Sequence, residues 1–304
     1  MATAFSPANS VTTTTAAKFI PQIWSDEIVA AYKKNLVLAN LIKKMSFKGK
    51  KGDTVHIPAP VRGAASAKTA ENTVTMQAAS VADIPVLINK HYEYSRLIED
   101  IVEVQALASM RQFYTDDAGY ALAKQVDTDI IRLGRGVQGG DGTADYTGAF
   151  SGADGTTAYT GTAGALTDAA IRRSIQRLDD NDVPMEGRFL IVPPSSRNTL
   201  MGLARYTEQA FVGEVGSANT IRNGEIGTLY GVPVFVSSNA DTATDGDRIC
   251  LLAHKDFAVL VEQQGVRSQT QYKQEYLGTL FTSDTIYGVK ELRDGSAVAL
   301  AVPA

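Results

Sequence analysis

The spacing of apolar and polar positions divides the first half of the chain into two predicted helices with an extended segment between them. Apolar residues recur at helical spacing after Pro21, so we expect a helix that begins there and reaches Leu41. A second helical pattern runs from Ile98 to Leu133 with almost no helix-breaking residue. It predicts a rod of about 35 residues, or roughly 50 Å.

Residues 53–96, between these helices, have the pattern of a long hairpin. A strand-like run begins at Thr54, and the returning strand is expected to run through Ile84 and on to Tyr94. Each arm of roughly 15–20 residues spans some 50–65 Å at about 3.3 Å per residue, whereas a compact chain of this length has a radius of gyration near 19 Å. Residues 64–80 are nearly all small or polar, so we expect the hairpin to project onto a neighbouring molecule.

The second half of the chain predicts a mixed α/β lobe that follows a loop rich in Gly, Ala, Thr and Asp at 134–164. A helix is expected from Thr167 to Asp180, with Thr167 as its N-cap, and another at about 195–204. Further predicted elements are strands at 188–193, 232–236, 248–252, 258–270 and 285–292, and a helix near 271–284.

The composition is that of a globular chain that is not specialised for nucleic acid. With 304 residues, two packed lobes are expected, and 44% apolar against 20% charged residues excludes wholesale disorder. The net charge of -4 argues against the positive field of a dedicated nucleic-acid binder. Residues 1–18 lack the features of a signal peptide, and no apolar run is long enough to cross a membrane, so we expect a cytoplasmic protein.

Two segments near the start of the chain leave alternatives open. Residues 1–18 carry one charge and form either a frayed terminus or an arm that orders against a neighbour. Residues 28–52 contain lysines but no acidic residue, which indicates either a solvated face or contact with nucleic acid or an acidic partner. The candidate contact residues are Lys43, Lys44, Lys48, Lys50 and Lys51.

Two motifs that suggest catalysis or nucleotide binding lack the context that their chemistry requires. Residues 134–139 match G-x-G-x-x-G, but they follow a predicted helix, whereas the dinucleotide fingerprint follows a strand and opens a helix. Cys250 and His254 are four residues apart, but Cys250 lies in an apolar strand, where an inert buried thiol is expected. The single cysteine also excludes a disulfide within the chain.

The histidines and acids show no ligand spacing for a metal. His56 and His91 face each other across the hairpin at best, and the acidic loop around Asp141 lacks the calcium-loop pattern. Asp127 and Asp129 are predicted to be acids on a helix surface. We therefore expect no catalytic, cofactor or metal site.

The segment GEIGTLYGVPVFVSSN at 224–239 resembles the A-domain of many tailed-phage major capsid proteins. The opening FIPQIWSDEIVAAYKKNLVLANL, followed by KKGDTVHIPAP, is similar to the start of capsid proteins of this group. The resemblance implies the Hong Kong 97-type capsid fold, an α+β fold. The parts that it implies are an N-terminal arm (1–20), an N-terminal helix and connection (21–52), an extended hairpin or E-loop (53–96), a P-domain with a spine helix (97–167), an A-domain (168–260), a returning P-domain strand and helix (261–292) and a C-terminal strand on the A-domain (293–304).

The function that this resemblance implies is structural. We expect a major capsid protein, not an enzyme, that forms pentamers and hexamers of the icosahedral head of a tailed phage and assembles in the host cytoplasm. Expected partners are other copies, a separate scaffolding protein, a portal, packaged double-stranded DNA on the inner face and, as a further candidate, a decoration protein. An encapsulin-like compartment shell and an unrecognised α/β hydrolase or transferase remain alternatives. Candidate inter-subunit contacts are Phe47, Lys68, Tyr92, Tyr94 and Arg96.

Overall fold

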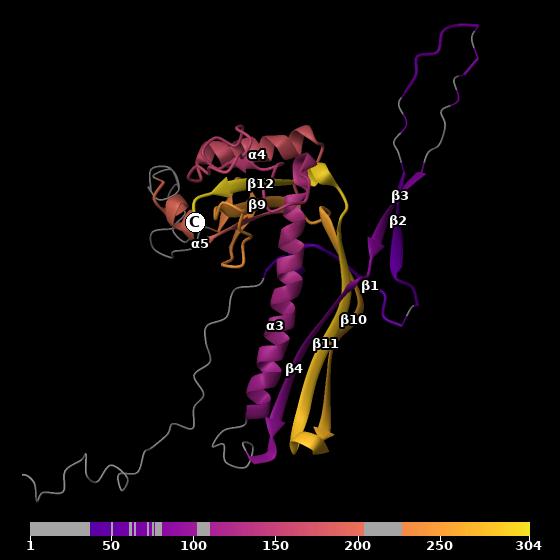
Figure 1. Cartoon of the computed structure of the whole chain (residues 1–304). Helices are drawn as coiled ribbons and strands as arrows, with labels where there is room; N and C mark the ends of the chain where they lie inside the picture. The colour runs from indigo at the N-terminus through magenta and orange to yellow at the C-terminus, as the bar shows by residue number, and fades with distance from the viewer. Residues whose placement is uncertain are drawn as a thin grey trace, which may run out of the picture.

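The computed structural model describes residues 37–49, 51–60, 63, 65–71, 73–74, 76, 81–101, 110–203 and 227–304. A long helix stands beside a tall narrow sheet, a mixed lobe lies across one end of the two, and a hairpin leaves the side of the sheet (Figure 1). The described parts of the chain therefore reach outward in two directions from a central rod.

The central rod consists of helix α3 (Met110–Arg132) and a four-stranded sheet. The sheet has the order β1 (Lys43–Ser46), β10 (Ala258–Lys273), β11 (Gly278–Glu291) and β4 (Lys90–Glu99). β10 pairs with β1 in parallel, and the other pairs are antiparallel. Ile130 and Ile131 of α3 share one core cluster with Leu260 and Tyr287 of the sheet, so the helix and the sheet are packed as two layers.

Two sequence predictions about this layer are wrong. Residues 98 and 99 end strand β4, so the expected helix does not begin at Ile98. Residues 100 and 101 are helical, residues 102–109 lie outside the described residues, and α3 is the main described part of the expected helix. The helix expected near 271–284 is absent, because the end of β10 and the start of β11 occupy that range. β11 lies between β10 and β4, and these long-range hydrogen bonds override the helix propensity of the local sequence.

The hairpin consists of β2 (Thr54–Pro60) and β3 (Val81–Leu87), which pair only with each other among the described strands. The predicted hairpin is present, but its expected length up to Tyr94 is wrong. The chain leaves the hairpin at residues 88 and 89, and β4 then joins the four-stranded sheet. Val55 and Val86 at the base of the hairpin pack against Val259 and Val261 of β10, which fixes the hairpin to the rod.

The mixed lobe is built on a six-stranded sheet (Figure 1). Two helices cover one face of this sheet, and the end of α3 packs against the other. The strand order is β5 (Phe150–Ser151), β12 (Ala297–Val302), β9 (Arg248–His254), β6 (Arg188–Val192), β8 (Val232–Val236) and β7 (Thr228–Leu229). Two helices, α4 (Asp168–Asp180) and α5 (Pro194–Met201), share a core cluster with β6, β9 and β12. The predictions of these two helices and of strands β6, β8 and β9 are confirmed.

The beginning of α4 shows why its sequence folds as expected. The Thr167 hydroxyl oxygen accepts a hydrogen bond of 3.2 Å from the Ala170 amide, so the predicted N-cap is confirmed. Ile171 and Leu178, seven residues apart, are buried on one side of the helix. Among the described residues, the remaining short elements are α1 (Leu38–Leu41) and the 3-10 turns η2 (Leu133–Arg135), η3 (Val137–Gly139), η4 (Gln274–Tyr276) and η5 (Asp294–Ser296). The helix expected from Pro21 to Leu41 is not continuous through residue 37, because Val37 is non-helical and α1 begins at Leu38. Residues 21–36 lie outside the described residues.

Candidate assembly surfaces

The outer part of the hairpin exposes large apolar side chains on a segment that is otherwise small and polar. Met76 is 95% exposed and Val74 is 74% exposed. Lys68, a predicted contact residue, is also exposed there. The hairpin points away from the body of the protein (Figure 1), so no described part of the same chain covers these side chains.

A second apolar surface lies at the end of the rod far from the mixed lobe (Figure 1), where the turn between β10 and β11 meets the end of β4. The Asp100 amide donates to the Leu277 carbonyl oxygen at 3.0 Å, and the Tyr272 hydroxyl donates to the Asp100 carboxylate at 2.8 Å. The members of this distal tip patch are the exposed side chains of Leu97, Ile101, Tyr272, Tyr276 and Leu277. The strand register places Leu97 and Tyr272 on opposite faces of the sheet, so the patch wraps around the end of the rod. Exposed apolar groups gathered in this way mark interaction surfaces. The sequence analysis missed this patch, because the range 271–284 was expected to be a helix.

Three predicted contact residues of β4 form contacts within the chain. Tyr92 packs against the core that the sheet and α3 share. The Tyr94 hydroxyl donates to the Asp117 carboxylate of α3 at 2.9 Å, and Arg96 Nε donates to the Tyr94 oxygen at 3.3 Å. This hydrogen bond to Tyr94 raises the pKa of the Arg96 guanidinium. These residues therefore hold β4 to the helix, and their contact with other subunits stays a prediction.

The predicted lysine cluster lies at the β1 edge of the sheet and in the turn after it. Lys43, Lys44, Lys48 and Lys51 are exposed, whereas Lys50 lies outside the described residues. The Lys44 ammonium donates to the Asn40 side-chain oxygen at 3.1 Å. Phe47, also predicted to contact a neighbour, is partly buried against the base of the hairpin.

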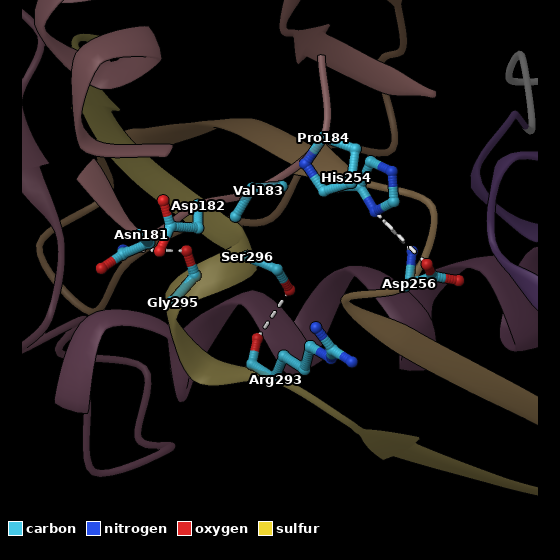
Figure 2. A pocket seen from close by; sticks show the side chains of 9 residues that line it. All are labelled: Asn181, Asp182, Val183, Pro184, His254, Asp256, Arg293, Gly295 and Ser296. Carbon is cyan, nitrogen blue, oxygen red and sulfur yellow. Dashed lines mark hydrogen bonds and ion pairs between the residues drawn. The ribbon is translucent and has the colours of Figure 1, made fainter. Parts of the chain in front are cut away.

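A polar cleft of about 450 Å³ lies where the turn after α4, the turn between β9 and β10, and η5 come together (Figure 2). His254, the residue in it most suited to catalysis, is buried. The Asp256 amide donates to His254 Nδ1 at 3.2 Å, so the other ring nitrogen, Nε2, carries the proton and donates to the Glu186 carbonyl oxygen at 2.9 Å. Both nitrogens are occupied by the backbone, so the ring has no position left for proton transfer.

Cys250 is not a nucleophile in this structure. Its side chain is fully buried in β9, and burial raises the pKa of the thiol to about 12. The thiol lies 3.4 Å from the Ser196 hydroxyl oxygen and has no histidine partner among the described residues. The prediction of an inert buried thiol is confirmed.

The two histidines of the first half lie apart, contrary to the pairing considered from the sequence. His56 bonds with Asp83 across the hairpin, whereas His91 lies 3.3 Å from Asp284 on the four-stranded sheet. Among the described residues, no three His, Cys, Asp or Glu side chains are grouped so that they could hold a metal ion. No helix in the described ranges is both long and apolar enough to cross a membrane.

Asp127 and Asp129 are the clearest failure of the sequence analysis at the level of single residues. Both were predicted to lie on a helix surface, but Asp127 is fully buried and Asp129 is 4% exposed. Asp127 accepts hydrogen bonds from the start of α1 and from Asn239 of the mixed lobe. Asp129 accepts a hydrogen bond of 2.7 Å from the Tyr287 hydroxyl of β11. No local signal shows this, because every one of these partners is more than 80 residues away in the sequence.

Comparison with known proteins adds a family and a set of similar shells. The sequence model of a family described as "Phage capsid protein" matches residues 98–299. A structure from Mycobacterium phage Che8 is 25% identical, with a TM-score of 0.75 over 93% of this chain and 97% of that one. The capsid of Cyanophage P-SCSP1u is 18% identical, with a TM-score of 0.73 over 99% of both chains, and so shows the fold alone. No curated protein sequence matches the chain.

Proposed function

The chain belongs to the phage capsid protein family and is a structural protein of the capsid shell, and we propose that it builds the icosahedral head of a tailed phage that encloses double-stranded DNA. The observation that carries this proposal is the family match over 98–299, which covers about two thirds of the chain. The resemblance found in the sequence is thereby confirmed. Neither a compartment shell nor an α/β enzyme is favoured by these matches.

We assign the chain to the Hong Kong 97-type fold within this family. A projecting hairpin, a long helix and a mixed lobe occur in the order that this fold requires, which supports the assignment. The proposed parts are an arm (1–20), a helix and connection (21–52), an E-loop (53–88), a P-domain (89–167 with 261–292), an A-domain (168–260) and a C-terminal strand on it (293–304). The E-loop ends earlier than the sequence suggested, because β4 pairs with β11.

The hairpin is proposed to bind the neighbouring subunit through its outer part. An isolated two-stranded hairpin is marginally stable in water, so a partner is needed to cover it. Val74 and Met76 supply apolar contacts and Lys68 supplies a charge. The distal tip patch is proposed as a second surface between copies, and many such modest contacts together stabilise a closed shell of pentamers and hexamers.

The contact residues predicted in β4 and near β1 are proposed to act mainly by fixing these surfaces in place. Tyr92, Tyr94 and Arg96 hold β4 to α3, and Phe47 packs at the base of the hairpin. Their replacement by Ala is expected to lower the assembly yield through loss of this support. Direct contact of the four side chains with a neighbour remains part of the proposal, and protection of each side chain from chemical labelling in assembled shells would test it.

The exposed lysines are proposed to contact packaged DNA or acidic groups of a neighbour. Charge reversal of Lys43, Lys44 and Lys48 to Glu is expected to reduce packaging or shell stability, whereas Arg172→Glu, at an exposed position of α4, is the control. Equal behaviour of the two variants would rule out this role. The protein is a component of the virion. From the family, we propose that it assembles in the host cytoplasm together with a separate scaffolding protein, a portal and a decoration protein.

Light scattering and negative-stain microscopy of the purified full chain test the proposed function. We expect closed shells or capsomer rings, with or without a crowding agent or co-expressed head proteins. Val74→Asp with Met76→Asp should block closure and leave the far-UV circular dichroism unchanged, and Thr69→Asp at an exposed position of the same segment is the control. A chain that stays monomeric under all of these conditions, co-expression included, would refute the proposal.

A further inference from the structure

One turn of α3 binds three parts of the protein that are distant in sequence. The Asp127 side chain is fully buried in this turn. Its Oδ1 accepts hydrogen bonds from the backbone amides of Leu38 at 2.8 Å and Ala39 at 3.3 Å, at the start of α1. Its Oδ2 accepts a hydrogen bond of 3.1 Å from the side-chain amide of Asn239, in the mixed lobe. A single carboxylate therefore joins the N-terminal segment and the mixed lobe to the helix.

The same turn also holds the four-stranded sheet. Asp129 accepts a hydrogen bond from Tyr287 of β11 and lies 3.1 Å from the Lys90 ammonium of β4. The Thr128 hydroxyl donates to the Lys124 carbonyl oxygen at 2.8 Å and accepts a hydrogen bond of 3.2 Å from Asn239. The helix is thereby fixed relative to the sheet at the point where the other two segments attach.

The bonds to Asp127 depend on one another because the carboxylate is buried. Removal from water raises the pKa of Asp127, and the hydrogen bonds from Asn239, Ala39 and Leu38 oppose that rise. If the Asn239 bond is lost, one oxygen of a buried anion has no donor, which favours protonation of the group or its movement toward water. Either change weakens the bonds to Leu38 and Ala39. The amides at the start of a helix have no partner within the helix, so they depend on this carboxylate.

We propose that Asp127 is a positioning residue for shell assembly, which couples the docking of residues 37–39 to the orientation of the mixed lobe. The proposal rests on the assembly function proposed above. The two segments attach on either side of one carboxylate, so a shift of the lobe that breaks the Asn239 bond also loosens the N-terminal segment. The coupling lets subunits in unequal positions of a shell change both parts together.

Hydrogen exchange in the unassembled full chain, measured by mass spectrometry, tests the coupling. Asn239→Ala touches neither Leu38 nor Ala39, yet it should speed exchange of peptides covering 37–41 by roughly tenfold, within the usual range of coupling between sites. Tyr159→Phe is the matched control, because it removes a partly buried hydrogen bond to Asp247 in the same lobe without touching Asp127. Exchange within β9 should be unchanged in both variants.

Swapping the hydrogen-bond donor and acceptor between positions 127 and 239 distinguishes a positioning role of Asp127 from a general loss of stability. Asn239→Asp alone places two carboxylates together and should speed exchange at 37–41 more than Asn239→Ala does. The double variant Asp127→Asn with Asn239→Asp restores a donor and an acceptor in reversed order, and it should return exchange to within a few-fold of the parent. If Asn239→Asp alone fails to fold, Asn239→Ala and the double variant still decide the question.

The result that overturns the coupling is unchanged exchange at 37–41 in Asn239→Ala. Shell assembly is read separately by microscopy, where Asn239→Ala should give a larger share of open or irregular particles than Tyr159→Phe. If Asn239→Ala speeds exchange at 37–41 but still forms normal shells, the proposed role of Asp127 in assembly is overturned. If the parent protein forms no shells, the function proposed above fails, whereas the exchange data still decide whether the two segments are coupled.

Discussion

Glu291 should make the stability of the protein depend on pH in an unusual direction for a carboxylic acid. It is the last residue of β11, at the junction of the sheet with the mixed lobe (Figure 1). No donor among the described residues reaches its buried Oε1 atom, and a Cβ atom placed on Gly136 would lie 2.9 Å from its Oε2 atom. Burial and, to a smaller extent, repulsion from Asp294 raise the pKa of Glu291 from 4.5 to about 7, and the positive charge of Lys290 opposes the rise.

The sign of the effect follows from proton binding. The folded protein binds the Glu291 proton more tightly than the unfolded chain, so the contribution to stability is complete below pH 4.5 and is lost as the pH rises to about 7. A shift from 4.5 to about 7, at about 1.4 kcal/mol per unit, sets an upper limit of about 3.5 kcal/mol. The side chain keeps some contact with water, so we expect roughly 1–2 kcal/mol.

Urea unfolding of the unassembled chain between pH 5 and pH 8 measures this contribution. Glu291→Gln removes the ionisation, so the stability of the parent relative to this variant should fall by roughly 1–2 kcal/mol over the range. Glu275→Gln, at an exposed position in η4, is the control and should follow the parent. If the difference in free energy of unfolding between the parent and Glu291→Gln does not change with pH, the reasoning is refuted.

Three further outcomes follow from local packing. Gly288→Ala places a Cβ atom 2.3 Å from the Leu87 carbonyl oxygen and should lower the free energy of unfolding by about 1–3 kcal/mol. Gly119→Ala has open space around the new Cβ atom, so it should leave the free energy of unfolding unchanged or raise it by up to about 1 kcal/mol. Equal effects of the two variants in urea titrations would contradict this reasoning. Thr167→Ala removes the cap of α4 and should cost about 1 kcal/mol in the same assay, with little loss in Thr167→Ser. Cys250, with its pKa raised to about 12 by burial, should react with a thiol reagent at pH 8 only after unfolding, and rapid labelling of the native chain would be inconsistent with the structure.

The sequence predicted the elements whose signals are local. Thr167 caps α4 through a residue three positions away, and the apolar runs of β6 and β9 are complete within each strand. The hairpin was predicted from its two strand-like runs, and its projection from the small and polar residues 64–80. The family resemblance then set these elements in order, which periodicity alone does not do.

The elements that were mispredicted depend on distant partners. Residues 274–276 and their neighbours are rich in helix-forming side chains, yet β11 is a strand because β10 and β4 bond to both of its edges. Asp127 is buried because Leu38 and Asn239, which are 89 and 112 residues away, supply its donors. Such pairings carry no local pattern.

The long-range pairing of the four-stranded sheet also has a consequence for synthesis on the ribosome. β1 and the base of the hairpin need β10 as a partner, with Lys43 opposite Val259, and β4 needs β11. Both partners emerge only after most of the mixed lobe has been translated, so the outward-reaching parts stay unsupported until late. A nascent chain that is interrupted within the mixed lobe lacks a fixed hairpin, so we expect such incomplete products to be excluded from a growing shell.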